Sequence, residues 1–132
     1  MDRVMIRIAI ALSMLGSSAS AFSESDVKTC LCFGRSEVNL PSGARVDCIQ
    51  DGFAIEVDPT GRWAEALGQS LHYAAVTNLR PKIVLYCIED FGVCLAHQLG
   101  LQETIKRFSL PIVLELHDEE SLRQVCPDTW AK

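Results

Sequence analysis

Three acidic side chains stand where strand geometry would bring them together. Glu56 and Asp58 lie two residues apart at the end of a predicted strand, so their side chains share one face of it. Asp47 lies in the preceding predicted strand, across an Asp-Gly turn that folds the two strands against each other. Three converging carboxylates form an oxygen-rich pocket, which suits a hard divalent cation such as Mg²⁺ or Mn²⁺.

A polar pair on the following predicted helix faces the same place. Gln69 and Tyr73 are four residues apart, so they stack on one helical face, which can look down the carboxyl end of the strand. A divalent cation bound by Asp47, Glu56 and Asp58 would polarise a phosphodiester and lower the pKa of a bound water that attacks it. These residue types and spacings therefore predict metal-assisted hydrolysis.

Each of these side chains also has a purely structural interpretation. Taken singly, Asp47 and Glu56 would cap turns, and Tyr73 would be a core residue with a satisfied hydroxyl. Trp63 is interpreted as a packing residue at the start of the helix, because apolar residues continue its face, and His72 as an ordinary surface or half-buried side chain. The combination of the acids with the polar pair, in this order, is what favours a catalytic site.

Turn signals and hydrophobic periodicity outline the elements that would position these residues. The predicted helices cover residues 22–33, 62–77 and from 93 or 95 to 108, and the predicted strands cover residues 37–40, 44–49, 53–57, 82–88 and 112–116. The first three strands form an antiparallel meander, and the unbroken apolar run of the fourth predicts a strand buried on both faces. The acids at 118–120 are interpreted as solvated surface. The order α-β-β-β-α-β-α-β predicts an α/β fold, with a mixed sheet and helices packed on its faces.

Three segments of the chain resemble the PD-(D/E)XK nuclease superfamily. They are Arg-Val-Asp-Cys at residues 45–48, Phe-Ala-Ile-Glu-Val-Asp at 53–58 and the helical stretch at 62–74. Within the last, the Gln-x-x-x-Tyr of residues 69–73 is similar to the motif of the RecB-like branch. Its Trp-x-Glu-Ala-x-Gly-Gln-Ser-Leu-x-Tyr pattern also resembles a group of small uncharacterised bacterial exported proteins. The resemblance covers roughly residues 24–116 and implies a restriction-endonuclease-like α-β-β-β-α-β core with an added helix and strand.

The resemblance implies a role for each residue of the predicted site. Asp47 would be the first metal ligand and Glu56 the second, with the backbone carbonyl of Val57 as a third. Gln69 and Tyr73 would orient the active-site groups or contact the DNA backbone. The implied cofactor is Mg²⁺ or Mn²⁺, and the implied substrate is DNA.

One position departs from the pattern of the superfamily. A lysine at this point positions the attacking water and stabilises charge on the phosphate in the superfamily, and this chain has Asp58 instead. Some restriction endonucleases resemble this chain in carrying an acid there and cleave with a second metal, so Asp58 would be an additional ligand. Arg62, one turn further on, is the nearest cation along the chain that could supply the positive charge.

The start of the chain has the features of a secretory signal peptide. Arg3 and Arg7 precede a short apolar run at residues 8–15, and small residues at 16–21 end in an Ala-x-Ala site. The apolar run is shorter than the roughly 20 residues that a membrane-spanning helix needs. We therefore predict cleavage after residue 21, a single domain at residues 22–132, and a periplasmic or secreted protein without membrane contact after the signal is removed.

Composition limits the partners that the protein can attract and predicts the redox state of its cysteines. The chain has a net charge of −5, and removal of residues 1–21 leaves about −6, so any DNA contact has to be local rather than a diffuse attraction. All six cysteines lie after residue 21, and an even count in a small exported domain predicts disulfides, with 15 possible pairings. Cys30 and Cys32 could instead be half of a metal site, although the histidines show no ligand spacing.

Four functional hypotheses follow from these patterns. The first is an exported Mg²⁺-dependent nuclease that hydrolyses DNA phosphodiester bonds. The second is a binding or structural protein on a nuclease-like fold whose chemistry lapsed when Asp58 replaced the lysine. The third is a thiol redox or metal-carrier protein that uses Cys30 and Cys32. The fourth is an intracellular nuclease whose apparent signal peptide is a mistaken start or a retained anchor. None of these patterns indicates an oligomeric state.

Overall fold

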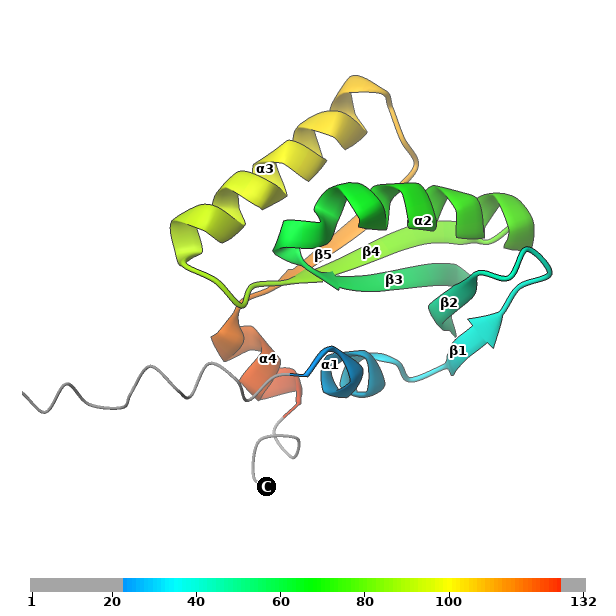
Figure 1. The fold of residues 1–132 in the computed structure, drawn as a ribbon, viewed down its shortest axis with the longest axis horizontal. Helices are drawn as coiled ribbons and strands as arrows, with labels where there is room; N and C mark the ends of the chain where they lie inside the picture. The colour runs from blue at the N-terminus through cyan, green and yellow to red at the C-terminus, as the bar shows by residue number, and fades with distance from the viewer. Residues whose placement is uncertain (1–22, 127–132) are drawn as a thin grey trace, which may run out of the picture.

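The structure, a computed structural model, describes residues 23–126 (Figure 1). In chain order, its elements are α1 (Glu24–Leu31), β1 (Arg35–Asn39), β2 (Arg45–Gln50), β3 (Phe53–Pro59), η2 (Thr60–Arg62), α2 (Trp63–Thr77), β4 (Arg80–Tyr86), α3 (Phe91–Arg107), β5 (Val113–His117) and α4 (Glu119–Val125). The predicted signal peptide at residues 1–21 lies outside the described residues.

A five-stranded mixed sheet lies between two pairs of helices, in the order β1-β2-β3-β4-β5 (Figure 1). Helices α2 and α3 cover one face of the sheet, and α1 and α4 lie against the other face. The predicted α/β class, with a mixed sheet and helices on its faces, is therefore confirmed.

The sheet changes direction at β3. Strands β1, β2 and β3 pair antiparallel, which confirms the predicted meander, and β3, β4 and β5 pair parallel. Strand β4 is flanked on both sides and mostly buried, as its apolar run predicts, but it begins and ends two residues before the predicted range of 82–88. The strand ends before Cys87, which is bonded to Cys94, and Ile88 is exposed instead of continuing the strand.

Side chains that cap the helices decide where they begin. Ser23 Oγ accepts a hydrogen bond from the Asp26 amide at 3.1 Å, which confirms the predicted start of α1. Asp90 does the same for α3 by accepting from the Gly92 amide at 3.1 Å, so this helix begins earlier than its apolar residues indicate. Asn78 ends α2 with a positive φ of 58°, a conformation that asparagine tolerates well.

The acidic segment after β5 differs from the prediction. Residues 118–120 are exposed, as expected, yet they also begin the helix α4, which was not predicted because the segment is too short to show helical periodicity. Asp118 Oδ1 accepts a hydrogen bond from the Ser121 amide at 2.7 Å and so caps the helix. Leu122 is fully buried and packs the helix beneath the sheet.

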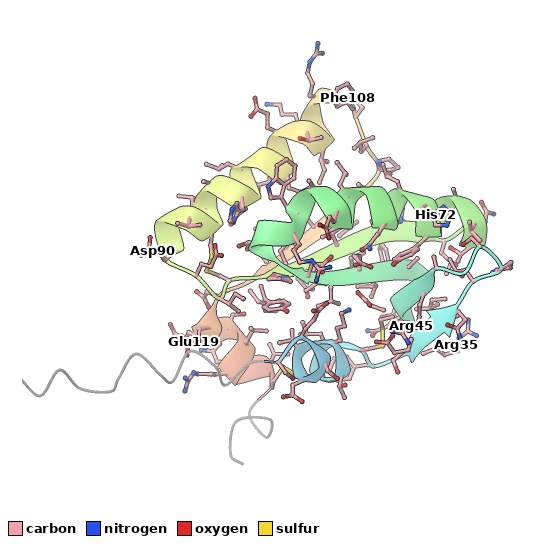
Figure 2. All side chains as sticks on the ribbon, viewed as in Figure 1. Arg35, Arg45, His72, Asp90, Phe108 and Glu119 are labelled. Atoms are coloured by element: carbon pink, nitrogen blue, oxygen red, sulfur yellow. A yellow bond between two sulfur atoms is a disulfide. The ribbon has the colours of Figure 1, made fainter. Side chains whose placement is uncertain are left out.

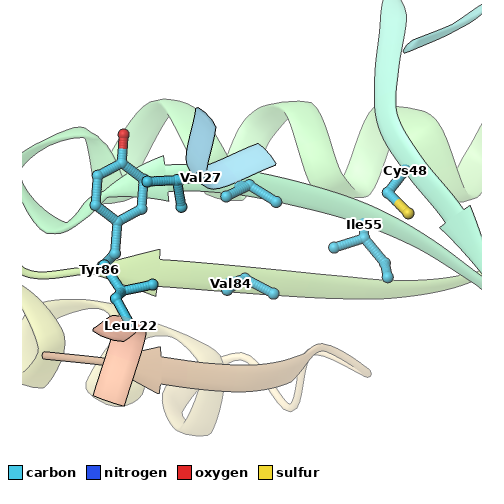
Figure 3. Packing of buried hydrophobic residues seen from close by; sticks show 7 residues of the cluster. Val27, Cys48, Ile55, Val84, Tyr86 and Leu122 are labelled. Atoms are coloured by element: carbon cyan, nitrogen blue, oxygen red, sulfur yellow. The ribbon is translucent and has the colours of Figure 1, made fainter. Parts of the chain in front are cut away.

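Two apolar clusters hold the helices to the sheet. On one face, Val27 of α1 and Leu122 of α4 pack with Val84 and Tyr86 of β4 (Figure 3). On the other face, Ala66 and Leu101 of the two covering helices pack with Ile83 and Leu85 of β4. Trp63 lies at the edge of this second cluster, half-buried, which agrees with its interpretation as a packing residue at the start of α2.

Three disulfides join all six cysteines, so the predicted disulfide framework is confirmed. Two of them hold α1, one to the end of α4 and one to β2, and the third joins the end of β4 to the first turn of α3: Cys30–Cys126, Cys32–Cys48 and Cys87–Cys94. Such pairing fits an oxidising compartment outside the cytoplasm. None of the helices described here is long and apolar enough to cross a membrane.

The backbone of Gly34, between α1 and β1, lies very close to the backbone of Ile49 in β2. A Cβ at this position would collide with the carbonyl oxygen of Ile49, whereas a Cβ at Gly68, in the middle of α2, would meet nothing within 4 Å. We expect Gly34→Ala to lower the free energy of unfolding by about 1–3 kcal/mol, and Gly68→Ala to raise it by about 0.5–1 kcal/mol. Urea unfolding measures both, and equal stabilities would contradict the observed approach.

Candidate functional site

A pocket of about 480 Å³, lined mostly by polar residues, opens where β2 leaves β3, with α1 and α2 in its walls. Its walls carry acids, cations and the predicted helix pair, and two of the lining residues, Arg45 and His72, are labelled in Figure 2. The residues that line it are Glu24, Lys28, Ala44, Arg45, Asp47, Glu56, Asp58, Arg62, Gly68, Gln69, His72 and Tyr73. The pocket therefore gathers residues from α1, β2, β3, η2 and α2.

Asp47 marks the point where the two strands separate. The pairing of β2 with β3 runs from Gln50 opposite Phe53 to Cys48 opposite Ile55. Next to it, Asp47 Oδ2 accepts a hydrogen bond from the Val57 amide at 2.8 Å. The buried carboxylate thus takes the place of a strand partner for this amide, because a buried backbone N–H needs an acceptor.

The other two acids project from β3 into the same pocket. Glu56 is 3% exposed and Asp58 is 2% exposed, and Glu56 Oε2 and Asp58 Oδ2 have no hydrogen-bond partner. Burial raises the pKa of Glu56 above its ordinary value of 4.5, and the neighbouring carboxyls of Asp58 and Asp47 raise it further. Burial also raises the pKa of Asp58, against the opposing effects of Glu56 and Arg62. Without another cation, Glu56 is therefore protonated at neutral pH.

Lys28 of α1 is the cation that lies deepest in the pocket. Its Nζ is 2.9 Å from Asp47 Oδ1 and 3.0 Å from Glu24 Oε1. Burial alone would lower the pKa of Lys28, but hydrogen bonds with Asp47 and Glu24 outweigh burial and raise it. Lys28 is therefore a permanent positive charge in the wall of the site.

Arg62, the cation proposed from the sequence, lies at the rim. Its Nη1 is 3.8 Å from Asp58 Oδ1 and 3.5 Å from Glu24 Oε2, and its side chain is half-exposed. It also pairs with Glu65 on the first turn of α2 at 3.3 Å. Arg62 thus shares its charge among three carboxylates, two of which are well exposed to solvent.

Helix α2 presents Gln69 and Tyr73 to the pocket, as their spacing predicts. Gln69 is exposed and Tyr73 is buried. Burial, and then the carboxyls of Glu56 and Asp47, raise the pKa of Tyr73, so its hydroxyl stays protonated and able to donate. His72 Nε2 lies 2.9 Å from Ser42 Oγ, which joins α2 to the turn between β1 and β2.

The pocket brings together the five side chains that the sequence singled out, namely Asp47, Glu56, Asp58, Gln69 and Tyr73. Val57 does not line it; its side chain packs in the core and its amide serves Asp47. Sequence reasoning missed Lys28 and Glu24. The i,i+4 spacing of these two residues was visible, but nothing in the sequence indicates that α1 crosses over to β2.

Whether a divalent cation fits the pocket depends on which carboxylate oxygens are free to bind it. Buried carboxylate oxygens without a partner are costly, so Glu56 and Asp58 would gain from a bound cation. Both oxygens of Asp47 are already engaged, by Lys28 and by the Val57 amide. Within residues 23–126, no three acidic, histidine or cysteine side chains form a preassembled metal cluster. The donor chemistry suits Mg²⁺ or Mn²⁺, and a cation shared with Asp47 would have to displace the Lys28 ammonium.

The disulfides bear on the thiol hypothesis. Cys30 and Cys32 do not pair with each other, and each is bonded to a distant cysteine. In this oxidised state neither residue supplies a free thiol for redox exchange or metal transport. The Cys32–Cys48 bond also leaves the pocket open, since neither sulfur lines it.

Comparison of the chain with protein-family models, with curated proteins and with solved structures found no match. The resemblance to PD-(D/E)XK nucleases therefore depends on the sequence motifs described above.

The raised pKa of Glu56 predicts a pH dependence of stability in the metal-free protein. In the unfolded chain the Glu56 carboxyl ionises near pH 4.5, whereas in the folded protein its raised pKa keeps it protonated. The free energy of unfolding therefore falls as pH rises above 4.5. Glu56→Gln mimics the protonated carboxyl and does not titrate. In EDTA, we expect this variant to exceed the wild type in unfolding free energy by about 1–3 kcal/mol near pH 8 and by little near pH 4.

Urea unfolding of both proteins across this pH range measures the effect. Comparison with Glu103→Gln, an exposed acid on α3, corrects for a general change of net charge. A Glu56→Gln variant that is no more stable than the wild type at high pH would show that Glu56 is ionised in the folded protein.

Proposed function

We propose that this protein is an exported, metal-dependent nuclease that hydrolyses DNA phosphodiester bonds. The observation that carries the proposal is the pocket lined by Asp47, Glu56 and Asp58, in which one buried oxygen of Glu56 and one of Asp58 have no hydrogen-bond partner. Proteins rarely bury carboxylate oxygens without a partner, and acids with raised pKa values in a pocket are typical of a functional site.

The order of elements supports a restriction-endonuclease-like core for the proposed enzyme. Helix α1, the antiparallel β1-β2-β3 meander, α2 and the parallel strand β4 follow one another in the α-β-β-β-α-β order that the resemblance implies. In the proposal, α3 and β5 are the added helix and strand, and α4 is a further addition.

In the proposed reaction, Asp47, Glu56 and Asp58 would hold Mg²⁺ or Mn²⁺. When bound, the ion would lower the pKa of a water molecule and neutralise charge on the phosphate. The attacking water would lose one proton as its oxygen bonds to phosphorus, and the leaving ester oxygen would take up one proton as its bond to phosphorus breaks, so the reaction consumes one water. The Val57 amide donates a hydrogen bond to one oxygen of Asp47 and so fixes the orientation of this proposed ligand.

Helix α2 supplies neutral hydrogen-bond donors to the same place. The raised pKa of Tyr73 keeps its hydroxyl protonated, and Gln69 carries an amide that is exposed toward solvent. Neutral donors suit a DNA backbone because they bind phosphate oxygens without competing for the cation. Arg45 and His72 also line the pocket, where their side chains would contact the DNA backbone.

A second candidate function is a binding or structural role on the same fold without catalysis. The observation that favours it is the Lys28 ammonium, which neutralises Asp47 as a metal ion would. In that case Asp58, where the superfamily has lysine, would mark a lost activity, and the pocket would keep its charges balanced without an ion.

The proposed activity is tested with the purified, oxidised protein on linear double-stranded and single-stranded DNA with Mg²⁺ or Mn²⁺. We expect cleavage that EDTA abolishes. Asp47→Asn and Glu56→Gln should each reduce the rate by at least about 100-fold, because even outer partners of metal ligands contribute 10- to 100-fold. Glu103→Gln, which removes an exposed acid far from the pocket lining, should cleave as the wild type does.

Two results would contradict the nuclease. Cleavage that survives both Asp47→Asn and Glu56→Gln would come from another site or from a contaminant. No cleavage, together with no heat of binding for Mg²⁺ or Mn²⁺ by calorimetry, would favour the binding or structural role.

A further inference from the structure

Helix α1 forms one wall of the pocket although it belongs to neither the sheet nor the motif-bearing helix. It places Glu24 and Lys28 in the lining, opposite α2. Lys28 Nζ reaches Asp47 Oδ1 at 2.9 Å, so a positive charge lies beside the acids where the reacting phosphate would enter. The charge that β3 lacks at position 58 is thus available from a different element.

Lys28 has a second partner that keeps it in place. Its Nζ is 3.0 Å from Glu24 Oε1, and Glu24 is in turn 3.5 Å from Arg62. If a cation or the substrate takes over Asp47 Oδ1, the contact with Glu24 still holds the ammonium at the pocket. Lys28 is therefore positioned to meet charge that develops on a phosphate.

The apolar attachment of α1 is slight. The helix has eight residues, a length that is not stable by itself in water, and Val27 is its one fully buried residue. Two disulfides make up for this: Cys30 is bonded to Cys126 at the end of α4, and Cys32 is bonded to Cys48 beside Asp47. Both bonds join segments far apart in the chain, with sequence separations of 96 and 16.

We propose that α1 completes the site only in the oxidised protein, where its two disulfides hold Lys28 in the pocket wall so that the ammonium stabilises charge on the attacked phosphate. This inference rests on the proposed nuclease function. Reduction by a dithiol would break each S–S bond with two electrons and two protons, giving two cysteine thiols while the dithiol becomes a disulfide. The released helix would take Lys28 and Glu24 out of the pocket.

The consequence is a nuclease site that is incomplete before export. In a reducing cytoplasm neither disulfide persists, so the positive charge would not be in place near the DNA of the host. The site would assemble when the exported chain is oxidised.

The first experiment compares Lys28→Met with Lys82→Met. Both lysines are ion-paired and similarly buried, with side chains 20% and 22% exposed, but Lys82 pairs with Glu115 and does not line the pocket. We expect Lys28→Met to lower kcat by about 100-fold or more with little change in KM for DNA, as removal of a charge-stabilising donor does. Lys82→Met should keep its kcat, and Lys28→Arg should recover part of the loss.

The second experiment removes the disulfides one at a time as double Cys→Ser variants. Cys30→Ser with Cys126→Ser, and Cys32→Ser with Cys48→Ser, should increase amide hydrogen exchange in residues 24–31 while β3 and β4 stay protected. Both should lower kcat. Cys87→Ser with Cys94→Ser is the matched control, since that bond closes a separation of only seven residues and does not touch α1. It should leave exchange in α1 and the cleavage rate unchanged.

The outcomes separate this inference from the proposed function. Full activity in Lys28→Met, or protection of residues 24–31 that persists in both α1 disulfide variants, overturns the inference while the nuclease stands. Loss of protection throughout β3 and β4 overturns it as well, because the helix would then not be released on its own. If the oxidised wild type does not cleave DNA, the nuclease fails and the catalytic role of Lys28 fails with it, whereas the exchange data still decide whether disulfides hold α1.

Discussion

The carboxylate of Asp47 in β2 connects this strand to β3 and to α1. One oxygen accepts from the Val57 amide of β3, and the other pairs with Lys28 of α1. The next residue, Cys48, is bonded to Cys32 beyond the end of the same helix. Because β2 stops pairing with β3 at this point, the site opens there, and its shape depends on how these links hold the separated strands and α1. A change at Asp47 would therefore affect the pocket walls as well as the chemistry.

The acids of the pocket oppose folding, and other features of the chain compensate for them. Glu56 and Asp58 are buried with oxygens that have no partner, and burial raises the pKa of both. Such groups destabilise a small domain. The compensation comes from the apolar clusters on both faces of the sheet and from three disulfides, which constrain the unfolded chain. A chain that retains buried carboxylate oxygens without a partner at this cost is expected to use them.

Much of this arrangement could be predicted from the sequence, because local patterns determine it. The Asp-Gly turn, the alternation in residues 53–57 and the Ser23 cap gave elements that are confirmed, and the spacing of Gln69 and Tyr73 gave a shared helical face. What could not be predicted depends on long-range contacts. No local pattern indicates which cysteines pair, so the contact of Lys28 with Asp47 could not be predicted from the sequence. Helix α4 was missed for the same reason, since a single buried Leu122 and a capping Asp118 are a weak signal in seven residues.

In the proposed enzyme, Asp47, Glu56 and Asp58 would form a site for a divalent cation beside the Lys28 ammonium. The most direct measurement is a crystal structure of the oxidised protein soaked in Mn²⁺, with anomalous diffraction used to locate the metal. The account predicts an anomalous peak at coordination distance from carboxylate oxygens of at least two of these three acids, with Lys28 Nζ still in the pocket. A pocket without such a peak at a saturating concentration of Mn²⁺, or manganese bound only elsewhere on the protein, would contradict it.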